Sequence, residues 1–221
     1  MSRARDRILG RLRDAQGAHA SHDSVLSREP TDIQRSMIPP REQSTQERTE
    51  QFIRAAEGLG SFVHRVGSPG EAVEQIMTLL DGDTRALAWD DDQLPILDLR
   101  SVLESLGVGI AAHNDDGARV GITGISAALA GTGSLVLESG AGRYRATSLL
   151  PDLHIALLTP EQILPDLESW AEAQRETGYR AFRDSSNTII ISGPSKTADI
   201  GHELVKGAHG PRELHILLLG D

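Results

Sequence analysis

The sequence predicts an α/β fold with three layers, in which helices lie on both faces of a mostly parallel β-sheet. Two observations support this fold class. From about residue 50 onwards, segments with helical spacing of apolar residues alternate with short strand-like segments. Several of these strands are apolar at consecutive positions, as strands that are buried on both faces of a parallel sheet are. Aromatic residues make up only 3% of the chain, so we expect an aliphatic core.

The first 48 residues differ in composition from the rest. Five arginines lie between residues 3 and 13, and Ile8, Leu9 and Leu12 share one helical face. This pattern fits either a short amphipathic helix that docks on a partner or a basic tail. Ser, Thr, Gln, His and Pro dominate from Gly17 onwards, and Pro39-Pro40 excludes a helix there. We therefore expect an extended arm over residues 1–48, which could mediate homo-oligomer formation, and one α/β domain over residues 49–221.

The elements of the domain follow from periodicity and capping signals. For example, Ser68 and Glu71 form a capping-box pattern around Pro69, which predicts a helix start. Helices are expected at residues 52–59, 69–80, 99–106, 122–130, 160–175 and 198–205. Strands are expected at residues 62–66, 85–89, 108–112, 134–137, 153–158, 188–192 and 214–219, with 188–192 buried.

Composition excludes several classes of protein. The net charge is −10, which argues against a general nucleic-acid binder. The chain has no cysteine, so it cannot form disulfides or hold zinc or an iron–sulfur cluster through its own thiolates. We expect no membrane span, because no apolar run is long enough. The charged N-terminus does not resemble a secretory signal, so we expect a cytoplasmic protein.

Ligands of parallel α/β folds usually bind at the carboxyl ends of the strands. The loops expected there are residues 90–92, 138–145, 159–160 and 193–197. Asp90, Asp91 and Asp92 form either a site or, in the simpler interpretation, a solvated turn.

The strongest local signal follows the strand at 188–192. The segment contains five candidate ligand-binding residues and a sixth shortly after them: Gly193, Pro194, Ser195, Lys196, Thr197 and Asp199. If a helix starts here, its free N–H groups and its dipole favour an anion such as phosphate or carboxylate. Lys196, one of only two lysines, adds a positive charge. The segment is not a Walker loop, because Ser195 stands in place of the second glycine, and an ordinary strand-to-helix turn is the alternative.

Two further motifs supply candidate residues. In the turn at 207–212, His209 could act as an acid or base, or could bond loop carbonyls, and Gly210 and Arg212 are candidate ligand-binding residues. No metal site is expected, because Lys206 replaces the second histidine that a zinc motif beginning at His202 and Glu203 would need.

The other motif spans residues 131–143. Glu138 could act as a nucleophile or base at a strand end, with Gly133 and Arg143 as candidate ligand-binding residues. Alternatively, Glu138 forms a structural ion pair with an arginine. His154, in the strand at 153–158, is interpreted as a hydrogen-bonded strand histidine.

Together these motifs resemble the LutC/YkgG family of lactate utilization proteins. The resemblance covers roughly residues 50–219. It rests on Val120-Gly121-Ile122-Thr123-Gly124, Gly131-Thr132-Gly133-Ser134, Leu149-Leu150-Pro151-Asp152-Leu153-His154-Ile155, Gly193 to Ile200, and Gly207 to Leu214. The family usually has Arg at the position of Lys196 and often has Thr at the position of Ser134.

The resemblance implies a fold of the NagB/RpiA/CoA-transferase-like type and a role in oxidising L-lactate to pyruvate. It also implies two partner proteins that carry the iron–sulfur centres, which agrees with the lack of cysteine here. The cofactor of this chain itself, if any, stays unknown, and no catalytic residue is transferred from the family.

Three functions follow as hypotheses. In the first, the chain is the non-iron–sulfur component of such a system, binding a small anionic or nucleotide-like ligand and docking its partners. In the second, it is an independent acyl- or phosphoryl-handling enzyme, because Glu138 resembles the nucleophile in the Glu-x-Gly loop of CoA-transferases. In the third, it is a regulatory or structural module that oligomerises through its arm.

Overall fold

The computed structural model describes residues 7–11, 13–14, 43–198 and 204–220. Residues 7–11 and 13–14 are helical, and the side chains of Ile8 and Leu9 are exposed. Helix α3 (Thr45–Gly58) begins shortly before the start predicted for the domain, with Ser44 as its N-cap. Assembly through an N-terminal arm stays a prediction. In the described part of the chain, no helix combines the length and apolar character needed to cross a bilayer.

The predicted α/β fold is confirmed by a six-stranded sheet in which all neighbouring strands run parallel. Its order is β1-β12-β7-β4-β2-β3. The strands are β1 (Phe62–Val66), β2 (Arg85–Ala88), β3 (Gly109–Ile110), β4 (Val120–Thr123), β7 (Leu153–Leu158) and β12 (Glu213–Leu219). Strands β7 and β12 lie inside this order, and both are almost entirely buried.

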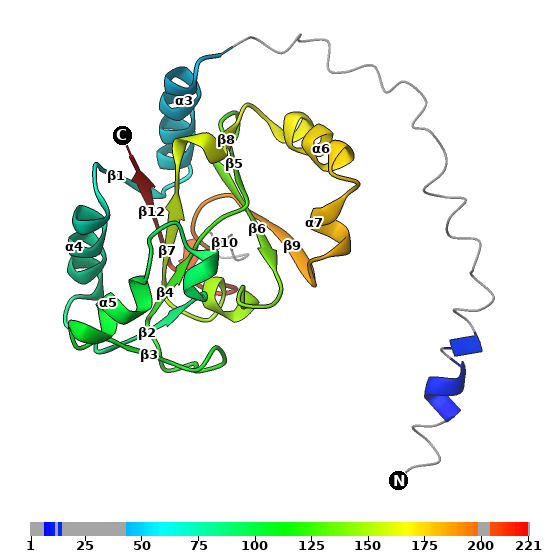
Figure 1. Ribbon diagram of the computed structural model, residues 1–221, viewed down its shortest axis with the longest axis horizontal. Helices are drawn as coiled ribbons and strands as arrows, with labels where there is room; N and C mark the ends of the chain where they lie inside the picture. The colour runs from blue at the N-terminus through cyan, green and yellow to red at the C-terminus, as the bar shows by residue number, and fades with distance from the viewer. Residues whose placement is uncertain (1–6, 12, 15–42, 199–203, 221) are drawn as a thin grey trace. The chain divides into compact units, whose positions relative to one another are not determined.

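Both faces of this sheet are covered (Figure 1). Helices α4 (Pro69–Leu80) and α5 (Leu99–Ser105) pack against one face through aliphatic side chains such as Ile76 and Leu103. On the other face, Phe52 and Ala56 of α3 join a core that the sheet shares with a second, smaller sheet. The aliphatic core expected from the low aromatic content is present on both sides.

The smaller sheet was not expected. Its order is β8-β5-β6-β9, and its strands are β5 (Ala127–Leu129), β6 (Ser134–Ser139), β8 (Ile163–Leu164) and β9 (Asn187–Ile191). Trp170 of α6 (Leu167–Glu176) and Ala181 of α7 (Arg180–Arg183) pack against its outer side. Single-turn 3₁₀ helices lie at η1 (Asp91–Gln93), η2 (Arg145–Ser148) and η3 (Pro160–Gln162).

Three of the predicted helices are wrong in whole or in part. Residues 122–130 form the end of β4 and all of β5, because a short run buried on every side has no periodicity that distinguishes a helix from a strand. Residues 160–175 divide into η3, β8 and α6. The prediction of a helix at 198–205 is wrong at both of its ends. The first end lies in β10 (Lys196–Ala198) and the second in β11 (Leu204–Lys206), and these two strands pair antiparallel. The β-branched Thr197 and Val205 are partners in that pairing, which suits their strand preference.

Strand β9 is also less buried than predicted. Among the strands that the structure describes, it pairs only with β6, at the edge of the smaller sheet. Ile190 is half-exposed, and its neighbours in β9 are only partly buried. One face of β9 is therefore available to line a cavity.

Gly133 allows α3 to pack closely against the turn between β5 and β6. Its φ of +65° lies in the left-handed region, and a Cβ placed there would overlap backbone atoms of Ala55 and Ala56. This explains the glycine by packing rather than by ligand binding.

We expect Gly133→Ala to lower the free energy of unfolding by about 2–4 kcal/mol, because it combines left-handed strain with overpacking. Urea unfolding followed by circular dichroism measures this. Gly82→Ala is the matched control, since Gly82 has a φ of +87° but no atom within 4 Å of the added Cβ. Equal losses in the two variants would contradict the close approach of α3.

Candidate functional site

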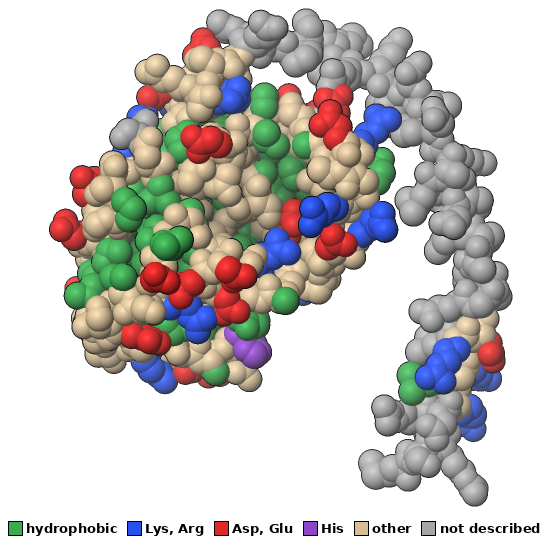
Figure 2. Space-filling view, viewed as in Figure 1, with side chains coloured by type: hydrophobic (Ala, Val, Ile, Leu, Met, Phe, Trp, Pro, Cys, Tyr) green, Lys and Arg blue, Asp and Glu red, His purple; other side chains and the backbone are tan. Residues whose placement is uncertain are grey.

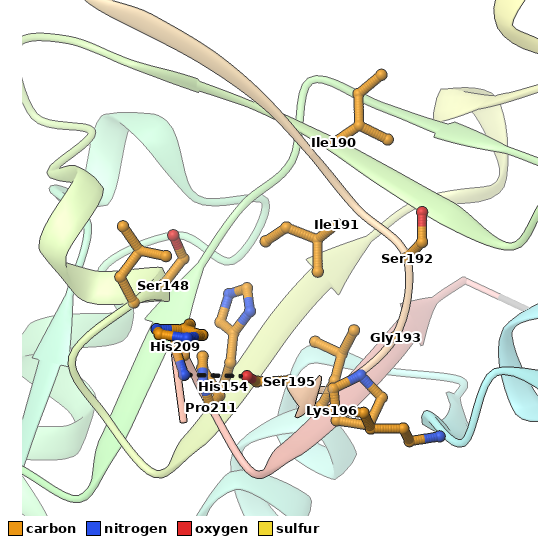
Figure 3. Close-up of a pocket in the computed structure, with 14 residues that line it drawn as sticks. Ser148, His154, Ile190, Ile191, Ser192, Gly193, Ser195, Lys196, His209 and Pro211 are labelled. Atoms are coloured by element: carbon orange, nitrogen blue, oxygen red, sulfur yellow. Dashed lines mark hydrogen bonds between the residues drawn. The ribbon is translucent and has the colours of Figure 1, made fainter. Parts of the chain in front are cut away.

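A cavity of about 340 Å³ lies between the two sheets, where residues distant in the sequence come together (Figure 3). Its floor includes His154 of β7 and Leu214 of β12, which are partners in the register of the main sheet. Its remaining walls come from the end of β9, the loop after it, the turn before β12 and the turn before β7. The full lining is Ser148, Leu149, His154, Ile190, Ile191, Ser192, Gly193, Pro194, Ser195, Lys196, His209, Gly210, Pro211 and Leu214.

Two of the predicted motifs meet at this cavity. Gly193, Pro194, Ser195 and Lys196 lie on one side, and His209 and Gly210 lie on the other. The motifs are joined through Ser195, whose backbone N–H donates to Pro211 O at 2.8 Å and whose carbonyl accepts from Gly207 N at 3.0 Å. The hydroxyl of Ser195 accepts from His209 N at 3.3 Å. The fold thus brings these six candidate residues together, and their roles stay predictions.

The position of the cavity differs from the expected one. His154 and Leu214 are the second residues of β7 and β12, so the cavity lies at the amino ends of these parallel strands rather than at their carboxyl ends. Only the loop after β9, which belongs to the smaller sheet, follows the carboxyl end of its strand. A second cavity, of about 320 Å³, lies at the carboxyl edge of the main sheet beside Thr159 and Gly220, so the expected loop at 159–160 does border a cavity at that edge.

The acidic run at Asp90 has structural partners. A carboxylate oxygen of Asp90 lies 2.6 Å from Arg100 Nη1, and the Asp91 carboxylate accepts from Arg100 N at 2.9 Å. These contacts fix the start of α5. They make the run a supported turn rather than a candidate ligand site.

Lys196 lies at the rim of the cavity and its ammonium is bound elsewhere. Nζ donates to Leu59 O at 2.6 Å, and Figure 3 shows the side chain extending away from His154. Leu59 is the C-cap residue of α3, where a cation favours both the free carbonyl and the helix dipole. Because β10 takes the place of the start of the expected helix, the prediction of an anion site at a helix N-terminus is wrong, although Gly193, Pro194, Ser195 and Lys196 of that segment do line the cavity.

Two other candidate residues, Arg212 and Gly133, lie outside the lining of this cavity. Arg212 lies 3.4 Å from Asp152 in an exposed ion pair, and Gly133 packs against α3. Asp199, His202 and Glu203 lie outside the described residues, and only the backbone of Thr197, in β10, is described.

Glu138 pairs with Arg143 at 3.4 Å, and its side chain is 16% exposed. A carboxylate held by an arginine beside it, away from the cavity, matches the structural alternative rather than the nucleophile of a CoA-transferase-like enzyme.

His154 is the residue that the sequence analysis undervalued. It lies in β7 and accepts or donates a 2.8 Å hydrogen bond between Nε2 and Thr123 Oγ1, as expected of a strand histidine, yet its ring also borders the cavity. Burial lowers the pKa of His154 to about 4, so the ring is neutral at neutral pH. The available signal was a single polar residue within the otherwise apolar segment Leu153–Leu158.

Gly121 explains how the turn before β7 reaches the cavity. Gly121 is the register partner of His154 in β4. A Cβ at this position would collide with Thr147 O and with the ring of Pro151. The bare backbone therefore lets η2 lie on the sheet, which brings Ser148 and Leu149 to the cavity.

The lowered pKa of His154 predicts a loss of stability in acid. An unfolded histidine binds its proton near pH 6.5, whereas folded His154 does so only near pH 4, so stability present above pH 6.5 is lost as the pH falls toward 4. Between pH 7 and pH 5 this residue should cost about 2 kcal/mol of unfolding free energy.

Urea unfolding at both pH values, with His154→Gln as control, measures this contribution. Burial also lowers the pKa values of His64 and His215, so these residues likewise lower the stability in acid, both in the wild type and in the His154→Gln variant. The variant should retain their part of the pH dependence and lose that of His154. An identical pH dependence would show that His154 does not titrate this way.

Comparison with known proteins shows what this chain is similar to. Residues 110–219 match the LUD domain family. Lactate utilization protein C of Halalkalibacterium halodurans is 34% identical over 57% of this chain and 58% of its own length. The uncharacterized protein YkgG of Escherichia coli is 30% identical over 80% of this chain and 81% of its own length. Lactate utilization protein C of Shouchella clausii is 32% identical over 66% of this chain and 70% of its own length.

A solved structure has the same fold. The crystal structure of a DUF162 family protein from Deinococcus radiodurans aligns with a TM-score of 0.58 and 23% identity, covering 81% of this chain and all of that one. The chain covers less than two thirds of the Halalkalibacterium relative but most of YkgG. By sequence, the chain belongs to the LutC/YkgG family of LUD-domain proteins.

Proposed function

We propose that this chain is the non-iron–sulfur component of an L-lactate utilization system that oxidises lactate to pyruvate. In this function it binds a small anionic or nucleotide-like ligand in the cavity at Ser195 and His154 and docks iron–sulfur partner subunits in the cytoplasm. The observation that carries the ligand-binding part is that two separate sequence motifs form opposite walls of one cavity.

The names of the relatives support the metabolic part of the proposal, since several are lactate utilization protein C. The absence of cysteine supports a division of labour, because this chain's own thiolates cannot hold a cluster and the iron–sulfur partners must supply it. Acidic and basic side chains are interspersed on the face of the domain seen in Figure 2, which suits contact with a protein partner.

The size and lining of the cavity favour an organic ligand larger than lactate. About 340 Å³ lies within the range of small-molecule sites, and the walls are mainly apolar with a few hydroxyl and imidazole groups. Among the described residues that line the cavity, Lys196 carries the permanent positive charge, and it lies at the rim. The anionic part of a ligand would therefore lie at the rim and its apolar part within.

The metabolic role is tested by reconstitution. The purified chain is mixed with its two iron–sulfur partner proteins, and lactate-dependent reduction of a dye is followed. The rate should fall at least tenfold when this chain is omitted. An unchanged rate without it would contradict a role as a required component.

Ligand binding at the rim is tested with AMP as the probe. Lys196→Met should weaken binding of AMP about fivefold, because an exposed charge contributes about 1 kcal/mol to holding a phosphate. Isothermal titration calorimetry measures this. Arg212→Met removes a nearby charge that does not line the cavity and should leave the affinity unchanged. No binding of AMP, or equal effects of both variants, would contradict the proposed ligand site.

A further inference from the structure

We propose that His154 recognises an uncharged hydrogen-bonding group of the ligand, such as a carboxamide or a ring carbonyl, at the inner end of the cavity, with Thr123 as its positioning residue. This inference rests on the proposed function, because it concerns the same cavity. It divides the ligand into a neutral inner part and an anionic outer part.

The first step is the position of the ring. His154 is only 1% exposed, yet it lines the cavity. In Figure 3 the ring stands among Ser148, Ile191 and Ser195, which come from η2, from the end of β9 and from the loop that follows β9. A group that contacts this ring must therefore enter the cavity fully.

The second step is the state of the two ring nitrogens. Nε2 is held by Thr123 Oγ1 at 2.8 Å, and Thr123 is itself completely buried. The hydrogen bond of the ring to Thr123 is made through Nε2 and leaves Nδ1 at the opposite edge of the ring. One edge of the imidazole is thus anchored in the sheet, while the other carries a second polar atom. Nδ1 is not among the fully enclosed side-chain atoms without a partner, so we infer that it has access to the cavity, where a polar atom of the ligand can bond to it.

The third step is charge. The lining includes the apolar residues Leu149, Ile191 and Leu214 and the uncharged hydroxyls of Ser148 and Ser195, and burial keeps the imidazole of His154 neutral by lowering its pKa. The ammonium of Lys196 is bound to Leu59 at the rim. A carboxylate or phosphate beside His154 would lose its hydration without gaining an opposite charge, whereas a neutral amide or carbonyl would exchange one hydrogen bond for another.

The hydroxyl of Thr123 leaves both tautomers of His154 accessible. If the hydroxyl donates to Nε2, then Nδ1 carries the proton and donates to a ligand carbonyl. If the hydroxyl accepts from Nε2, then Nδ1 accepts from a ligand N–H. A group such as a carboxamide offers both partners, so either tautomer is served.

The test uses nicotinamide and nicotinate, which share a planar apolar ring and differ in that the first has a neutral carboxamide and the second a carboxylate. Each is titrated at pH 7 into the full chain labelled with ¹⁵N-histidine, and the nitrogen resonances of His154 are followed together with the backbone amides of Ser195 and Lys196. Nicotinamide should shift the Nδ1 resonance and bind at least fivefold more tightly than nicotinate. Equal or tighter binding of nicotinate, or no shift of Nδ1 with nicotinamide, would overturn the inference.

Variants separate recognition from folding. Asparagine places a polar atom near the position of Nδ1, whereas glutamine reaches that of Nε2. His154→Asn should therefore retain part of the preference for nicotinamide, and His154→Gln should abolish it. Thr123→Val should weaken binding of nicotinamide at least threefold, and Thr123→Ser should restore it, with amide spectra confirming that each variant is folded. Equal preference in both His154 variants would count against recognition through Nδ1.

The outcomes also distinguish this inference from the proposed function. If AMP shifts the amides of Ser195 and Lys196 while nicotinamide leaves His154 unchanged, the ligand site stands and the inner recognition fails. If neither probe shifts any of these resonances, both fail.

Discussion

The parallel pairing of β7 with β12 is the constraint on which the candidate site depends. Both strands are buried on both faces, so their register cannot slip without moving aliphatic side chains from one core to the other. That register places His154 opposite Leu214 and so fixes the floor of the cavity. It also brings together the segments that precede the two strands, where Arg212 N donates to Asp152 O at 2.7 Å. The walls follow from the same pairing, because Pro211 then accepts from Ser195.

The fold also requires that some backbone segments approach each other closely. Gly121 lets η2 lie on β4, and Gly133 lets α3 lie on the turn between β5 and β6. In each case the backbone of another segment occupies the space that a side chain at the glycine would need: that of Thr147 at Gly121, and that of Ala55 and Ala56 at Gly133. Both glycines thus bring separate parts of the chain into contact, and that contact, rather than a ligand, explains each of them.

Local patterns in the sequence predicted much of the main sheet. The expected strands Phe62–Val66 and Leu153–Leu158 coincide with β1 and β7, since each is short and bounded by turn signals. The smaller sheet was missed because residues 122–130 are buried except for the partly buried Ser126 and show no periodicity. Two walls of the cavity were found through their glycines and prolines, which mark rigid turns. That they face each other depends on strand order, which no local pattern encodes. His154 was recognised only as a strand residue, because its second role depends on the loops that surround it.

The hydrogen bond between Lys196 and Leu59 links the cavity to a part of the chain outside the family match, so substitutions there can affect the cavity. Every residue that lines the cavity lies within the region that matches the LUD domain family, residues 110–219, whereas Leu59 lies before it. Changes in the early part of the chain can therefore alter the charge available at the entrance through one carbonyl group. They leave untouched the imidazole and hydroxyl pair inside, whose two members are both encoded in the shared region.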